Sequence, residues 1–410
     1  MKKLILKTAG FIVVVVFSLT FAGFTQNSNG FQYSSMNTNT ITTTVPFLMI
    51  PPDARASGFG EAGVATSPDV NSQYWNPAKY AFIEKKMGIS LSYATWRGIS
   101  DNNTNSEYLA AYFKPDHKNA LAISARYFSS GVFTLISTST GTVTETMHPF
   151  EYAADASYSR KISDNLSLGL AFRYIYSDLN NGFVMSGIHP GRSYAGDISM
   201  FYTKPIHILA KESNFNFGVN ISNIGSKISY TTNTSPGDFI PTNLRLGSAL
   251  SMNIDDKNQL SIILDLNKLL VPSPPFYQLD SNNYPVIGTD GKPIVIAGKD
   301  PNVSVLEGMF QSFSDAPGGF REEIREVSFS TGIEYWYKKM IAVRSGFFYE
   351  DKSKGNRKYF TTGVGFKYRH YQLDAAYLAR LGHENSNFNI FKLTFLVTLD
   401  TFKKKKVSVT

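Results

Sequence analysis

The sequence predicts an all-β protein, a 14-stranded antiparallel transmembrane β-barrel with an N-terminal plug segment. Three observations lead to this fold class. Stretches of about ten residues alternate apolar and polar side chains, as strands do when one face meets lipid and the other a lumen. The connectors between them alternate between short and long. The charges inside the stretches fall on the polar phase.

Residues 1–25 have the pattern of a removable signal peptide. Lys2, Lys3 and Lys7 precede an apolar run without charge, and small residues permit cleavage after Ala22 or after Thr25. An N-terminal membrane anchor is the alternative. No later apolar stretch reaches the roughly 18 residues that a membrane helix needs. The chain contains no cysteine, so disulfides and thiol chemistry contribute nothing.

Residues 26–45 are rich in Asn, Ser and Thr, and we expect a flexible leader in the periplasm. Residues 46–85 differ from every later segment, because glycines, prolines and an Asn-Pro-Ala tripeptide interrupt any regular strand. A non-strand segment ahead of a barrel is well sized to fold into the lumen as a plug. Asp53, Arg55 and Asp69 would then meet charges of the wall.

Residues 86–400 form the predicted barrel. An even number of strands lets an antiparallel sheet close without a free edge. The two-residue period predicts strands at 87–96, 107–114, 120–137, 142–161, 166–177, 194–204, 213–223, 242–254, 259–268, 326–337, 341–350, 358–368, 371–380 and 387–399.

The connectors predict which end of the barrel faces which compartment. Short connectors such as 163–165 and 369–370 would be periplasmic turns, and 205–213 is a longer connector of the same set. The long connectors 178–193, 223–241 and 271–325 would be extracellular loops.

Charges in the strand centres predict a lumen lined by ion pairs. A lysine or arginine facing lipid at the bilayer midplane costs roughly 2–4 kcal/mol, so these charges belong inside. Hairpin symmetry places Asp155 opposite Arg173, Glu334 opposite Arg344, and Lys367 opposite Asp374. The same reasoning extends the pairs around the wall to Arg126, Asp197 and Lys392, while Arg245 and Asp265 share this phase without an assigned partner. A soluble β-sandwich with isolated pairs is the alternative.

The net charge of +8 is concentrated at the two ends of the chain. The signal peptide contributes three lysines, and Lys403–Lys406 lie in a basic C-terminal tail, residues 401–410. The body of the chain has no basic stripe interleaved with aromatic residues, which argues against a nucleic-acid partner.

No constellation of residues predicts catalysis, a metal site or a cofactor. The six histidines are scattered over turns and loops without metal-ligand spacing. No Ser-His-Asp arrangement or phosphate-binding loop is recognisable. We therefore expect a protein that is not an enzyme.

The connector 271–325 is the strongest candidate for a binding region. A structureless loop of this length is usually functional, and it carries seven acidic and four basic residues. Exposed aromatic residues beside prolines suit docking on another protein, although a cap that folds over its own barrel is the alternative. The candidate partner-binding residues are Pro274, Pro275, Phe276, Tyr277, Phe310, Phe313 and Phe320.

The plug segment carries a family resemblance. The stretch FLMIPPDARASGFGEAGVATSPDVNSQYWNPAKYAF, Phe47 to Phe82, resembles the N-terminal signature of the PorV family, outer-membrane subunits of the type IX secretion system of Bacteroidota. That family is similar to the FadL fatty-acid transporter superfamily, in which an Asn-Pro-Ala tripeptide lies in the plug. One departure is that Phe402 is followed by a polar tail, whereas many outer-membrane barrels end on an aromatic residue. The signature residues are Asp53, Arg55, Asn71, Trp75, Asn76, Pro77 and Ala78.

The resemblance implies a non-enzymatic subunit in the cell outer membrane, in contact with outer-membrane lipid. It would bind cargo bearing C-terminal signal domains at a SprA-type translocon barrel and hand it to a PorU-type sortase attachment complex. The alternative is a FadL-like transporter that passes hydrophobic small molecules through the lumen. Because small, polar and charged residues dominate the lumen phase, the sequence favours the secretion subunit.

Overall fold

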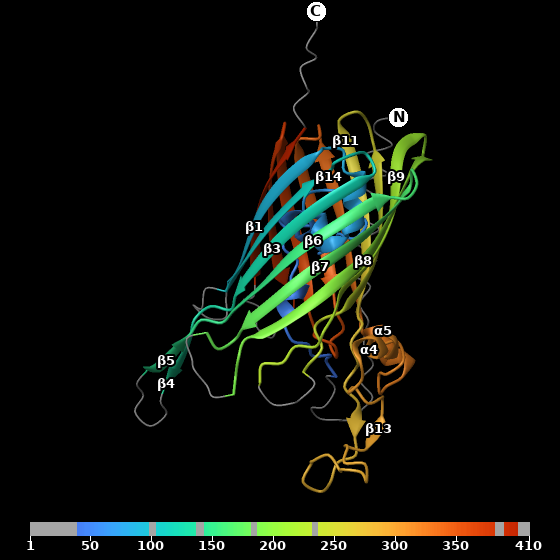
Figure 1. Ribbon diagram of the computed structural model, residues 1–410. Helices are drawn as coiled ribbons and strands as arrows, with labels where there is room; N and C mark the ends of the chain where they lie inside the picture. The colour runs from blue at the N-terminus through green and yellow to red at the C-terminus, as the bar shows by residue number, and fades with distance from the viewer. Residues whose placement is uncertain are drawn as a thin grey trace, which may run out of the picture. The chain divides into compact units, whose positions relative to one another are not determined.

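Fourteen antiparallel strands close into one barrel in the computed structural model, which confirms the predicted fold class (Figure 1). Each strand pairs with its neighbours along the chain, and β1 closes the barrel against β18. The structure describes residues 39–97, 104–136, 143–181, 187–231, 237–381 and 389–400. The predicted signal peptide, most of the predicted leader and the basic tail lie outside these ranges.

All wall strands except β3 and β6 begin and end within four residues of the predicted ranges. They are β1 (Met87–Arg97), β2 (Asn105–Phe113), β3 (Asn119–Ser129), β6 (Phe150–Lys161), β7 (Leu166–Asp178), β8 (Gly191–Ile208), β9 (Lys211–Gly225), β10 (Asn243–Asn253), β11 (Asn258–Leu269), β14 (Val327–Tyr337), β15 (Ile341–Tyr349), β16 (Lys358–Tyr368), β17 (Tyr371–Arg380) and β18 (Asn389–Leu399).

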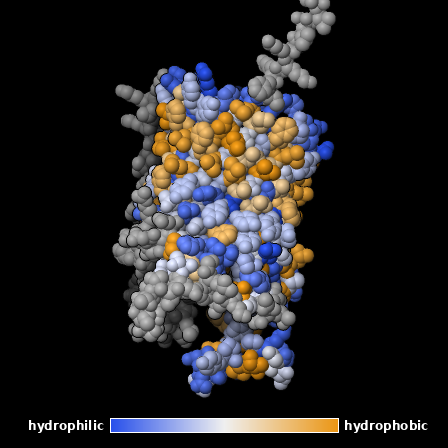
Figure 2. All heavy atoms as spheres, turned by 60° about the vertical axis from the view of Figure 1, so that its left-hand side comes forward, coloured by the Kyte–Doolittle hydropathy of each residue, from blue (hydrophilic) through white to orange (hydrophobic). Residues whose placement is uncertain are grey.

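Alternation along each strand separates a lipid-facing surface from a packed interior. In β3, Leu121 and Ile123 are exposed while Ala122 and Ser124 are buried. The apolar side chains gather in a belt nearer the short-turn end of the barrel, and the surface toward the long loops is more polar (Figure 2). Such a belt is the surface that a bilayer covers.

The structure corrects the prediction where turn chemistry interrupts a strand. Residues 120–137 and 142–161 are not two long strands, because β3 ends at Ser129 and a separate hairpin follows, β4 (Phe133–Ile136) and β5 (Val143–Met147). Gly131 adopts a φ of 89°, which breaks the extended backbone. The predicted connector 205–213 is mostly strand: β8 continues to Ile208 and β9 begins at Lys211. Only Leu209 and Ala210 form the turn, with φ values of 51° and 58°.

The long connector is structured, contrary to the prediction of a structureless loop. It contains β12 (Phe276–Tyr277), β13 (Val295–Ala297), α4 (Val305–Gln311) and α5 (Phe320–Arg325). Ser304 caps α4 by accepting a hydrogen bond from the backbone N–H of Glu307. Among the described residues, no helix has the length and apolar character needed to cross a bilayer.

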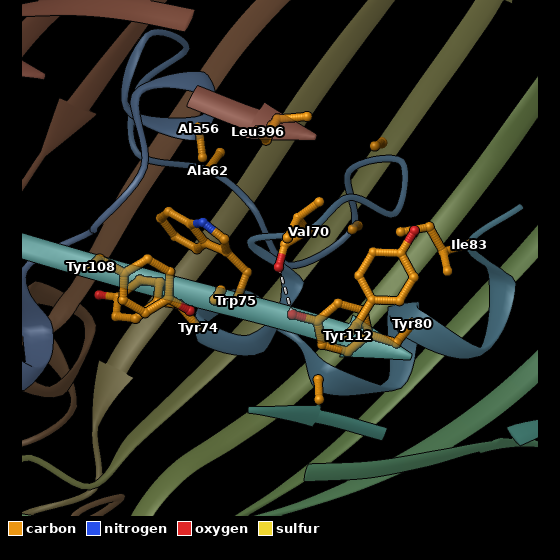
Figure 3. Close-up of a cluster of buried hydrophobic side chains, with 14 of the residues drawn as sticks. Ala56, Ala62, Val70, Tyr74, Trp75, Tyr80, Ile83, Tyr108, Tyr112 and Leu396 are labelled. Atoms are coloured by element: carbon orange, nitrogen blue, oxygen red, sulfur yellow. Dashed lines mark hydrogen bonds between the residues drawn. The ribbon is translucent and has the colours of Figure 1, made fainter. Parts of the chain in front are cut away.

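Four short helices form a plug inside the barrel (Figure 1). They are η1 (Pro46–Met49), α2 (Ala54–Ser57), α3 (Ser72–Trp75) and η2 (Pro77–Phe82). Plug and wall share a buried cluster in which Trp75 and Tyr80 lie close to Tyr108 and Tyr112 of β2 (Figure 3). The Tyr80 hydroxyl donates to the carbonyl oxygen of Val70 at 2.6 Å. The aromatic cluster therefore also supplies a hydrogen-bond partner to the plug backbone.

The first described residues, 39–45 of the predicted leader, lie at the long-loop end of the barrel and not among the short turns that the sequence predicts to be periplasmic. The backbone N–H of Thr44 donates to Phe239 at 3.0 Å, and the amide of Asn39 donates to Pro274 and Glu322, each at 3.0 Å. The plug therefore runs the length of the lumen, from the long loops to the start of β1 among the short turns.

Paired glycines in the wall let the plug backbone approach the sheet. Gly332 of β14 lies opposite Gly346 of β15, and a Cβ on either would come within 2.2 Å of backbone atoms of Phe59. Gly218 and Gly247 form a second opposed pair, and a Cβ on Gly218 would lie 2.4 Å from the carbonyl oxygen of Val64. We call these opposed pairs glycine seats. Glycine has no Cβ, so it leaves room for the plug backbone that any other residue would fill.

Replacing one of these glycines should loosen the plug. We expect Gly346→Ala to lower the free energy of unfolding by about 1–3 kcal/mol, the usual cost of overpacking, as measured by urea titration in detergent micelles. Gly196→Ala is the matched control, because its Cβ would meet only Ala171 at 3.4 Å. Equal effects of the two variants would contradict the proposed seat.

Candidate functional site

The candidate functional site is the interface between plug and wall, where charged side chains are buried. Glu334 of β14 accepts hydrogen bonds from Arg344 at 2.7 Å and from Arg55 of the plug at 2.9 Å. Arg55 also bonds Asp69 at 2.8 Å, and Arg344 bonds Asp374 at 2.7 Å. A buried charge is tolerated only when it is paired and hydrogen-bonded. Arg55 therefore ties the plug electrostatically to the wall.

A second ionic cluster crosses β3, β6, β7 and β8. Arg173 bonds Asp155, which lies directly opposite in register, and reaches Asp197 at 3.0 Å. Arg126 lies 4.0 Å from Asp155 and donates to the carbonyl oxygen of Leu48 in the plug at 3.0 Å. Here too the wall charges extend to the plug.

The predicted series Lys367, Asp374 and Lys392 is wrong. Strands β16 and β17 pair Tyr368 with Tyr371, so Lys367 lies opposite Gln372 and is two residues out of register with Asp374. Asp374 bonds Arg344 instead. Lys392 turns into the plug, where it donates to Pro51 at 2.7 Å and lies 3.5 Å from Glu61.

Wall cations that donate to plug carbonyl oxygens are a recurring device. Besides Lys392 and Arg126, Arg245 of β10 donates to Tyr74 at 3.1 Å, and Lys114 donates to Ala81 and Ile83, each at 2.8 Å. Asp265 of β11 supplies the complementary contact by accepting from the backbone N–H groups of Gly63 and Val64. The sequence places Arg245 and Asp265 on the lumen phase, but only the tertiary structure identifies their partners.

The signature residues organise the plug itself. Asp53 caps α2 and accepts a hydrogen bond from the indole N–H of Trp75 at 2.7 Å, and fully buried Asn71 precedes α3. The side-chain amide of Asn76 donates to Val64 of the plug at 3.1 Å and to Met200 of β8 at 2.9 Å. Asn76 thus links two segments of the plug and also links the plug to the wall.

The other two members of the tripeptide extend this contact. Pro77 begins η2, a position where a missing N–H costs nothing. The backbone of Ala78 then bonds both neighbouring strands, donating to Ser199 at 3.1 Å and accepting from Ser167 at 2.7 Å.

An acidic cluster in the long loop is already neutralised by lysines. Asp315, Glu323 and Glu326 lie close enough together to ligate a cation. Lys268 bonds Glu323 at 3.1 Å and Glu326 at 2.6 Å, and Lys354 bonds Glu326 at 3.0 Å. Glu323 and Glu326 thus have ammonium partners, and their ion pairs anchor the end of α5 to the wall.

The predicted partner-binding residues divide into two groups. Phe310 and Phe320 are 77% and 79% exposed, Phe276 and Phe313 are also exposed, and Tyr277 is half-buried. Pro275 is buried and Pro274 half-buried, so the prolines do not form part of an exposed docking surface as expected. Gly298 packs directly on Pro275, which places the proline inside the loop.

Three solved barrels are similar to this chain. The CymD monoaromatic hydrocarbon channel is 12% identical with a TM-score of 0.51, covering 88% of this chain and 99% of that chain. The P. putida toluene transporter TodX is 11% identical with a TM-score of 0.50, covering 85% and 99%. A Pseudomonas aeruginosa FadL homologue is 11% identical with a TM-score of 0.44, covering 88% and 99%. At such identities the first two show a shared fold and nothing more. A search of curated protein sequences gave no match.

The closed barrel with a plug in its lumen thus has the fold of the CymD and TodX barrels. A family profile described as "Type IX secretion system protein PorV" matches residues 33–276, more than half of the chain. The chain therefore belongs to the PorV family, which confirms the resemblance in the plug segment and places the protein in the outer membrane as a component of type IX secretion.

Neutralising Glu334 should weaken the barrel measurably. Glu334→Gln leaves Arg55 and Arg344 short of a buried carboxylate, and we expect a loss of about 3 kcal/mol in the free energy of unfolding. Lys292→Gln is the control, because the Lys292–Asp300 pair is exposed and worth at most about 1 kcal/mol. Urea titration measures both, and similar losses would contradict the buried-pair account.

The long loop should be held more tightly at mildly acidic pH. Burial, together with nearby Glu323 and Glu326, raises the pKa of Asp315 from 3.8 to about 6. A raised carboxyl pKa means that the folded loop binds the proton more tightly, so stability rises as pH falls from 7 toward 5. Hydrogen exchange of residues 271–325, corrected for intrinsic rates, measures this. Asp315→Asn should abolish the difference and exposed Asp290→Asn should preserve it; a pH dependence that survives Asp315→Asn would contradict the assignment.

Proposed function

We propose that this barrel is a non-enzymatic docking subunit of type IX secretion. It receives cargo with C-terminal signal domains from a SprA-type translocon barrel and passes it to a PorU-type sortase attachment complex at the cell surface. The observation that carries the proposal is the contrast between a lumen filled by an ionically bound plug and a long loop with exposed aromatic side chains.

Five exposed apolar side chains of the long loop lie on helices α4 and α5 and on the segment between them. We call this set the loop patch: Leu306, Phe310, Phe313, Phe320 and Ile324. On each helix an apolar pair is spaced four residues apart, Leu306 with Phe310 on α4 and Phe320 with Ile324 on α5. Side chains four apart share one helix face, so each helix presents a continuous apolar ridge. Contiguous exposed apolar side chains suit a protein partner.

The loop patch stands on a rigid base. Lys268 extends from β11 and Lys354 from the connector between β15 and β16, and both bind Glu326 at the end of α5. Ser273 adds a backbone bond to Asp315 at 3.1 Å. A preformed surface loses less conformational entropy when a partner docks. This base supports a role in presentation to a partner at the cell surface.

The alternative function is a transporter that passes hydrophobic small molecules through the lumen. The described neighbours CymD and TodX are a hydrocarbon channel and a toluene transporter by their titles. In this chain the middle of the lumen holds Arg55, Glu334, Arg344 and Asp374, all buried and bonded. An apolar solute would have to displace these bonds, and therefore the secretion role is preferred.

Polar substitution in the loop patch tests the proposal. Phe310→Ser with Phe320→Ser should weaken binding of a cargo C-terminal domain to the purified barrel about 30-fold or more, the loss of a hot spot of about 2 kcal/mol. Surface plasmon resonance measures this binding. Leu209→Ser is the matched control, because Leu209 is 87% exposed on a turn at the opposite end.

A deletion strain provides the cellular readout. Cargo should stay unsecreted or unattached in the deletion strain, and the doubly substituted chain should fail to restore secretion where Leu209→Ser succeeds. Normal secretion in the deletion strain, with loss of hydrophobic solute uptake, would overturn the proposal in favour of a transporter.

A further inference from the structure

A cavity opens at the short-turn end of the barrel, on the side opposite the loop patch. Its volume is about 380 Å³, and plug and wall both contribute to its lining. Arg55 and Gln372 lie at its inner boundary, and each is bonded to a deeper carboxylate, Arg55 to Glu334 and Gln372 to Asp374 at 2.7 Å. Bonded, buried side chains thus form part of the lining, and an occupant would enter from the short-turn end.

Unpaired cations line this cavity. Lys339 comes from the β14–β15 turn and Lys367 from the end of β16, and both are exposed. Neither forms an ion pair with any described residue. His370 joins them, with its Nδ1 atom 3.0 Å from the carbonyl oxygen of Thr398. Of the carboxylates on the lining, Asp69 is bound by Arg55, and Glu84 is exposed.

The surrounding rim has the same sign of charge. The described short turns and adjoining strand ends carry thirteen Lys and Arg against seven Asp and Glu. These residues lie in 84–86, 114–118, 160–164, 204–212, 254–257, 338–339, 367–370 and 400. The long loop 271–325 is acidic by contrast, with seven acidic and four basic residues. The cavity lining itself has four Lys and Arg against two Asp and Glu, and a concave site with such an excess of one charge concentrates ligands of the opposite sign.

From these observations we infer that the cavity docks an acidic segment of a periplasmic polypeptide. Lys339 and Lys367 pair with its carboxylates, while Trp336, Ile83 and Leu396 on the same lining pack against its aliphatic stems. The two lysines line the barrel mouth and not its lipid-facing surface, so bilayer headgroups around the wall do not supply their counterions. The inference is independent of the loop patch and of the role in secretion.

Binding of a synthetic oligoglutamate peptide to the purified full-length protein tests the inference. Calorimetry should detect binding that weakens with salt, and the matching oligoglutamine peptide should not bind. Lys339→Gln with Lys367→Gln should raise the dissociation constant about tenfold, as expected for about 1.4 kcal/mol. Lys118→Gln with Lys211→Gln removes the same charge from other short turns and should change it less than about twofold.

Three outcomes would overturn the inference. The first is that oligoglutamate does not bind. The second is that both double variants weaken peptide binding equally, which would assign the binding to diffuse charge on the rim. The third is that vesicles containing phosphatidylglycerol displace the peptide from the wild-type protein, which would assign the cations to lipid. Retention of the heat-induced gel shift by all variants shows that the barrels are folded.

Discussion

Burial of charge inside the barrel is the constraint on which the rest of the structure depends. A wall that faces lipid must send its ionisable side chains inward, and a charge inside must find a partner. The wall satisfies part of this need across its own strands, as Arg173 does with Asp155 and Asp197. The plug satisfies the remainder with Arg55 and with its backbone carbonyl oxygens. The plug is therefore a structural part of the barrel as much as an obstruction of its lumen.

The glycine seats and the cation contacts act together. Opposed glycines such as Gly332 and Gly346 bring the plug backbone against the sheet, and this closeness lets lysine and arginine side chains of the wall reach plug carbonyl oxygens. A larger residue at the seat would separate the partners of every such bond nearby. The ionic contacts then hold a plug that also packs Trp75 and Tyr80 against the wall, in one of the buried clusters that combine plug and wall residues.

The two ends of the barrel offer chemically different surfaces. The long-loop end presents apolar helix faces on an acidic loop, and the short-turn end presents a basic mouth closed by the plug. With the middle of the lumen occupied by bonded charges, contact with partners falls to these ends. A family assignment to type IX secretion fits the docking surfaces that we propose at the two ends.

The sequence by itself determined the strand count, the facing of each strand, the pairs Asp155–Arg173 and Glu334–Arg344, and the family. These follow from a period of two and from local hairpin symmetry, which depend only on neighbours in the chain. The sequence prediction failed at the 369–370 turn. It placed Lys367 opposite Asp374, but the strands pair two residues out of that register, and Asp374 bonds Arg344 instead. Only the tertiary structure decided where the plug bonds, why Lys392 turns inward and why the prolines of the long loop are covered. Many of these contacts join residues far apart in the chain, such as Lys392 and Pro51, and their geometry exists only after the barrel has closed around the plug.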